Sequence, residues 1–83
     1  MPVPIRVHIS YFAVFREQRG LSQETLETTA TTAGEFFDEV SARHAFTIPP
    51  AVVRVAINKE FRTMDAPLAA GDEIVFVPPV AGG

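Results

Sequence analysis

The strongest constraint on the fold is an alternation of apolar and polar side chains near the start of the chain. Apolar residues occupy every second position from Val3 to Tyr11, with polar residues or proline between them. This period of two is that of a β-strand with one buried face. Gln23–Thr28 is rich in threonine around a central Leu26. We expect it to be a second strand that forms a hairpin with the first.

The segment between these two strands, Phe12–Leu21, is interpreted as a connection with Gly20 as its turn. Phe12 has the opposite parity to Tyr11 and is therefore expected to point away from the core.

A helix is predicted to begin at Thr32. Thr32 and Glu35 have the spacing of a capping box, in which both side chains satisfy free amides at a helix start. The apolar residues that follow have the spacing of one helical stripe: Ala33, Phe36, Phe37 and Val40. Pro49 and Pro50 cannot continue a helix, so it should end near Ala45.

The remainder of the chain is predicted to contain three strands and three turns. The expected strands are Val52–Ile57, Glu60–Thr63 and Glu73–Val77, and the expected turns are Asn58-Lys59, Asp65–Leu68 and Ala70–Asp72. The last strand is apolar on both parities, which suits a central strand covered on both faces.

The order of elements predicts an α+β fold of the β-grasp type. A mixed sheet of four to five strands would curl around one main helix, with the first and last strands adjacent and parallel at its centre. We expect 1–83 to be a single domain with a flexible C-terminal tail, 78–83.

Composition narrows the functional classes. A net charge of −3 argues against a nucleic-acid groove, and the absence of cysteine excludes a thiolate nucleophile or metal site. No apolar run is long enough to span a membrane and no signal peptide is apparent, so a cytoplasmic protein is expected. The two histidines, His8 and His44, lack further ligands at suitable spacing, and no metal site is predicted.

The chain ends in Gly82-Gly83, directly after an apolar and proline-rich segment. No side chain shields a glycine carboxylate, so it can enter a narrow pocket and react there. Pro78 and Pro79 would end the sheet and direct the chain outward, and 78–83 would reach roughly 20 Å in an extended form. Joined to AMP, the Gly83 carboxylate would gain a leaving group, and a sulfur donor would then convert it to a thiocarboxylate.

The segment Gly71–Gly83 resembles the C-terminus of the small subunits of molybdopterin synthase, a family of ubiquitin-like sulfur carriers. Three other segments are similar to that family: Tyr11–Glu17, Ala56–Asn58 and Asp65–Leu68. The resemblance implies that an E1-like enzyme uses ATP and magnesium to adenylate Gly83. The thiocarboxylate then donates sulfur to cyclic pyranopterin monophosphate in molybdenum cofactor biosynthesis.

The resemblance also implies the partners. The tail would enter a large subunit, and two small and two large subunits would form the working synthase. The chain would be a carrier that binds no cofactor and is not an enzyme on its own. Two alternatives stay open: a carrier of the same mechanism for thiamine, cysteine or tRNA thiolation, and a ubiquitin-like modifier that joins Gly83 to lysines.

A docking surface is expected beside the tail. If Ile74 and Phe76 face the helix, other apolar side chains are left for the open side of the sheet, and these form our predicted docking patch: Phe12, Phe61, Val75 and Val77. We expect this patch to contact both the large subunit and the activating enzyme. The tail residues Pro78, Pro79, Val80 and Ala81 are expected to bind the same partners, with Gly82 and Gly83 entering the reactive site.

Overall fold

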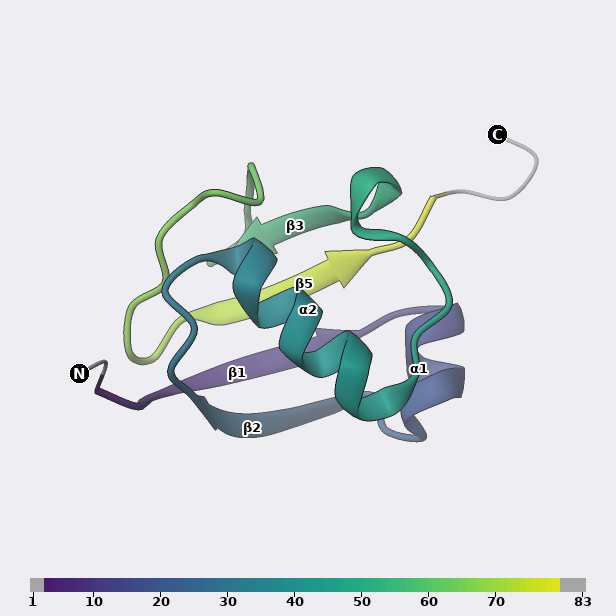
Figure 1. Ribbon diagram of the computed structural model, residues 1–83, viewed down its shortest axis with the longest axis horizontal. Helices are drawn as coiled ribbons and strands as arrows, with labels where there is room; N and C mark the ends of the chain where they lie inside the picture. The colour runs from purple at the N-terminus through teal and green to yellow at the C-terminus, as the bar shows by residue number, and fades with distance from the viewer. Residues whose placement is uncertain (1–2, 80–83) are drawn as a thin grey trace.

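The computed structural model describes residues 3–79. The elements, in chain order, are β1 (Ile5–Tyr11), α1 (Val14–Arg19), β2 (Gln23–Thr28), α2 (Ala33–His44), the 3-10 helix η1 (Pro50–Val52), β3 (Arg54–Ile57), β4 (Glu60–Arg62) and β5 (Glu73–Val77). The five strands form one sheet in the order β2-β1-β5-β3-β4, and α2 crosses one face of it (Figure 1). This is the expected β-grasp architecture.

The first and last strands are neighbours at the centre of the sheet. β1 pairs with β5 in parallel and with β2 as an antiparallel hairpin, while β3 pairs antiparallel with both β5 and β4. This confirms the predicted mixed sheet. Because β5 lies between β1 and β3, the chain leaves the sheet from its middle, at the end where α1 and η1 lie (Figure 1).

The core lies between α2 and the sheet. The predicted stripe of α2 is buried, and so are Ile74 and Phe76 of β5. The ring of Phe76 packs edge-on against Phe37, with a centroid separation of 4.9 Å. The apolar side chains of β1 with the parity of Tyr11 face this core. The side chains of opposite parity form a second face of the sheet, here called the open face.

The helix α2 begins as the capping pattern predicts, with one difference. The Thr32 hydroxyl accepts a hydrogen bond from the Glu35 amide at 3.2 Å. The Glu35 carboxylate, however, accepts from the amide of Thr31 at 2.8 Å, one residue before the N-cap. The helix ends at His44, and Ala45 caps it in the left-handed conformation.

One predicted connection is wrong. Phe12–Leu21 contains the six-residue helix α1, which ends at Arg19 and is capped by Gly20 with a φ of 83°. Only Phe15 of this helix is buried, so the segment shows no repeating apolar stripe. Gly20 does serve as the expected turn, because its positive φ closes the helix.

Smaller corrections concern the ends of elements. The third strand begins at Arg54 because Pro50 starts a turn of 3-10 helix in place of its first residues. Asn58 and Lys59 both have positive φ, as the predicted two-residue hairpin requires. The turn predicted at Asp65–Leu68 lies at Met64-Asp65, and Pro67 forms an isolated bridge with Thr32. None of the helices described is long and apolar enough to cross a membrane.

Candidate functional site

The candidate site lies where β5 ends. Val77 is the last residue of β5 to pair, with Arg54 of β3 as its partner. Pro78 and Pro79 follow directly, and neither has an amide hydrogen with which to extend the ladder. The two prolines thus end the pairing of this central strand at Val77.

Val75 lies in a row of side chains that crosses the open face of the sheet. The register joins Ser10 of β1 to Val75, Val75 to Ala56, and Ala56 to Phe61. Phe61 is 68% exposed although it is aromatic. Two residues of the predicted docking patch, Val75 and Phe61, therefore belong to one row with Ala56 between them.

The next row toward the tail holds the other two patch residues. Tyr11 pairs with Phe76, so the following residues, Phe12 and Val77, lie side by side, with Arg54 beyond Val77. Phe12 is 52% exposed. The structure therefore brings the four patch residues onto one face. Their role in docking stays a prediction.

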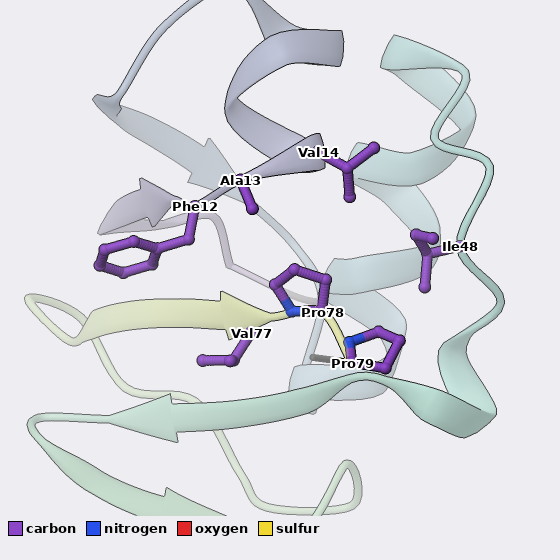
Figure 2. A pocket seen from close by; sticks show the side chains of 7 residues that line it. All are labelled: Phe12, Ala13, Val14, Ile48, Val77, Pro78 and Pro79. Carbon is purple, nitrogen blue, oxygen red and sulfur yellow. The ribbon is translucent and has the colours of Figure 1, made fainter. Parts of the chain in front are cut away.

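An apolar pocket of about 500 Å³ opens beside this second row. Its lining residues are Phe12, Ala13, Val14, Ile48, Val77, Pro78 and Pro79. Figure 2 shows Pro78 between Phe12 and Val77 on one side and Val14 and Ile48 on the other. We call this cavity the tail-root pocket. Of its seven residues, the sequence did not point to Ala13, Val14 or Ile48.

The backbone at Ala13 holds one wall of the tail-root pocket in an unusual conformation. Ala13 has φ 51° and ψ −123°, close to the first central residue of a type II′ turn, a position that favours glycine. The amide of Phe15 donates to the carbonyl of Phe12 at 3.0 Å and closes the turn. Such a conformation persists only where the surrounding structure enforces it.

A polar cluster supports the other end of this loop. The Tyr11 hydroxyl donates to one oxygen of Glu24 at 2.6 Å, and Arg19 of α1 donates to both Glu24 oxygens at 2.7 and 2.9 Å. The hydrogen bonds from Arg19 lower the pKa of the Glu24 carboxyl, against the effect of burial. Burial raises the pKa of the Tyr11 hydroxyl. The cluster ties α1 to β2 and has a structural role.

The two histidines lie on opposite sides of the sheet. His8 is on the open face, where its Nδ1 lies 2.9 Å from the Thr25 hydroxyl. His44 is in the last turn of α2, and its buried Nε2 has no hydrogen-bond partner among residues 3–79. Burial lowers the pKa of His44. The pair cannot share a ligand, and within the described part of the chain no cluster of three or more histidine or acidic side chains could hold a metal.

Four predicted site residues, Val80, Ala81, Gly82 and Gly83, lie outside the described residues. Their roles stay predictions from the sequence. The described structure ends at Pro79, which lines the tail-root pocket together with Pro78.

Comparison with known proteins gives a consistent result. The ThiS family matches residues 9–83. The molybdopterin synthase sulfur carrier subunit of Haemophilus influenzae is 31% identical over 80 residues, which cover 93% of this chain and 99% of that protein. The protein of the same description from Escherichia coli is 29% identical, with the same coverage.

Solved structures give a similar result. A putative molybdopterin converting factor, subunit 1, from Pyrococcus furiosus is 26% identical, with a TM-score of 0.75 over 92% of this chain and 99% of that one. A chain of the Amycolatopsis orientalis BexX/CysO complex is also 26% identical, with a TM-score of 0.66 over 93% and 99%. The ubiquitin of Caldiarchaeum subterraneum shares the fold, with 21% identity and a TM-score of 0.64 over 98% and 100% of the two chains.

Proposed function

The chain belongs to the ThiS family, and from that premise we propose that it is the sulfur carrier subunit of a molybdopterin synthase. The observation that carries the proposal is the full-length similarity to two proteins of that description. The geometry of β5 is in keeping with it, because this central strand is followed by two prolines that cannot extend the ladder, so pairing stops at one end of the sheet.

The reactive group in this proposal is the carboxylate of Gly83. A carboxylate at neutral pH is a poor electrophile, so an E1-like enzyme first joins it to AMP with ATP and magnesium, releasing pyrophosphate. A sulfur donor then displaces AMP, and the carbon–sulfur bond of a thiocarboxylate replaces one carbon–oxygen bond. The sulfur passes to cyclic pyranopterin monophosphate inside a large subunit, and two carriers and two large subunits assemble.

In this cycle the folded part of the domain provides the surface that the partners bind, while the tail carries the reactive group. The chain is a co-substrate and supplies no catalytic side chain, while its predicted docking patch holds the partners. Activation and transfer both require the same tail, so both partners would meet the face of the sheet beside β5. We place these events in the cytoplasm.

A second candidate has support from one observation. A chain of the BexX/CysO complex is 26% identical, the same value as the molybdopterin converting factor of Pyrococcus furiosus. This similarity keeps open a sulfur carrier of the same chemistry that serves another pathway; cysteine synthesis is one that the sequence left open. Thiamine synthesis, tRNA thiolation and protein modification are further alternatives from the sequence. All of these use Gly83, and they differ in the acceptor of the acyl or sulfur group.

Intact-mass spectrometry tests the shared chemistry. The chain is co-expressed with the activating enzyme of its own organism, and we expect a mass gain equal to the exchange of one oxygen for sulfur. A chain that lacks Gly83 is the control and should fold without this gain. Sulfur transfer that survived the deletion would disprove the mechanism.

The purified large subunit and its pterin substrate then test the pathway. We expect the thiocarboxylated chain to yield molybdopterin in this mixture. A thiocarboxylated chain that yields none, but transfers sulfur to another acceptor, would favour the second candidate. Conjugates between Gly83 and lysines of other proteins would indicate a modifier.

A further inference from the structure

The tail-root pocket is lined mostly by residues that do not belong to the docking patch. Its walls come from three separate segments: the residues between β1 and α1 with the start of α1, the loop before η1, and the end of β5 with the two prolines that follow it. Every lining residue is apolar or proline. A cavity of this size and composition is in the range that takes a buried apolar group.

Two prolines form part of the wall, and this links the pocket to the tail. Pro78 and Pro79 have fixed φ angles, so a group held against their rings also limits the direction of the chain that follows. A protein that receives the tail must approach this end of the sheet (Figure 1). A partner that holds the tail along its length therefore also comes to lie beside the pocket.

The charge beside the pocket indicates what kind of surface fits. Arg54 is exposed, lies across from Val77 in the register and projects from the same open face. Within 3–79, no carboxylate lies within ion-pair distance of its guanidinium, whereas Arg6, Arg19 and Arg43 each have one. A partner carboxylate placed next to the pocket would pair with Arg54.

The strained turn at Ala13 is a second observation that supports a functional role for the pocket. Glycine would remove the strain, but it would also remove the methyl group that lines the cavity. Backbone strain of this kind is concentrated at functional sites. The turn also holds Phe12 and Val14 on opposite sides of Ala13, as Figure 2 shows.

We propose that the tail-root pocket is an anchor for the partner protein: it receives an apolar side chain that lies next to a carboxylate on the partner, the carboxylate pairs with Arg54, and the filled pocket sets the direction of the tail. This inference rests on the proposed function, because it supplies the contact that aims the tail. It differs from the docking patch, since Phe61 and Val75 do not line the pocket.

A pair of charge reversals tests the ionic part. The probe is the purified large subunit of molybdopterin synthase from the same organism, titrated by calorimetry at low and at high salt. Arg54→Glu should weaken binding by about tenfold at low salt. At high salt the affinities of the variant and the wild type should differ less, because salt screens exposed charges. Arg62→Glu is the matched control: Arg62 is exposed on the same hairpin but has the opposite parity. It should bind within about twofold of the wild type, as expected for a charge outside the interface.

A pair of aromatic substitutions tests the cavity. Val14→Phe should fill the pocket and weaken binding by about tenfold, since a blocked pocket loses the burial of one apolar side chain. Leu21→Phe, at an exposed apolar position outside the pocket, should have no effect. Thermal melting of all four variants checks that each is folded. If Val14→Phe does not fold, Ile48→Phe replaces it as the pocket-filling variant.

The outcomes separate this inference from the proposed function. If the wild type binds the large subunit and Arg54→Glu and a folded pocket-filling variant bind equally well, the anchor is wrong and the carrier role stands. If the wild type does not bind at all, both are wrong.

A wild-type dimer that Val14→Phe dissociates would assign the pocket to a second copy. Methyl NMR signals of Ile48 that shift when 80–83 are deleted would assign it to the chain's own tail. Either result would overturn the anchor.

Discussion

The Tyr11 hydroxyl donates a 2.6 Å hydrogen bond to the carboxylate of Glu24, and this contact joins the end of β1 to the edge strand β2. Tyr11 is 2% exposed, so its hydroxyl depends on this acceptor. Arg19 donates to the same carboxylate from α1. Glu24 thus accepts hydrogen bonds from both the first strand and the short helix α1.

Replacing Glu24 with alanine should therefore destabilise the fold. The buried Tyr11 hydroxyl would lose its acceptor, which costs about 1–3 kcal/mol for a group of this kind. Glu27→Ala is the matched control on the same strand, because its pair with Arg6 is more than half exposed at both side chains. That variant should lose less than about 0.5 kcal/mol. Urea unfolding measures both, and equal losses would show that the cluster is not stabilising.

His44 predicts a dependence of stability on pH. Burial lowers its pKa from the ordinary value of 6.5; the positive charges of Arg19 and Arg43 act in the same direction, and Glu24 opposes them. The unfolded chain therefore binds a proton more readily than the folded chain. Above about pH 6.5 His44 should therefore not reduce the free energy of unfolding. That free energy should fall as the pH drops through the lowered pKa of the folded state.

The variant His44→Phe tests this dependence. It removes the titrating group and keeps an aromatic ring beside Phe46, which contacts His44 at a centroid distance of 6.0 Å. The free energy of unfolding should vary less between pH 7 and pH 5 than it does in the wild type. His8→Phe controls for the loss of a histidine and should retain the slope. A wild-type slope preserved in His44→Phe would rule out this histidine as its cause.

Ala13 offers a substitution that should stabilise the protein. Glycine accepts the φ of 51° without strain, so Ala13→Gly should gain about 1 kcal/mol, less the entropy that glycine adds to the unfolded chain. Ala42→Gly, in the exposed part of α2, should instead lose about 1 kcal/mol because glycine weakens a helix. Thermal melting compares the two. A loss of stability in Ala13→Gly would show that the turn is not strained.

The sequence predicted the elements that carry a repeating pattern. The stripe of α2 and the alternation of β1 each repeat several times, and β5 is apolar on both parities, so their burial and the central position of β5 followed directly. The helix α1 was missed because six residues with one buried side chain repeat nothing. Its first turn also depends on the positive φ of Ala13, which alanine does not signal.

The candidate site was predictable only in part. The open-face patch followed from strand parity, because β5 alternates between the two faces of the sheet. The tail-root pocket did not, since its walls come from segments far apart in the chain, and Ile48 reaches it through a loop without a regular pattern. The contact between Arg19 and Glu24 likewise depends on α1, which the sequence did not reveal.

The last prediction concerns Phe61, which belongs to the docking patch but does not line the tail-root pocket. Phe61 is 68% exposed, so Phe61→Asp should change stability by less than about 0.5 kcal/mol. Binding to both the large subunit and the activating enzyme should weaken by at least about tenfold, because a charge would be buried against an apolar surface. Leu21→Asp places the same charge at an exposed apolar position outside the patch and should bind both partners normally. A folded Phe61→Asp chain that binds both partners as tightly as the wild type would show that this row of the open face takes no part in docking.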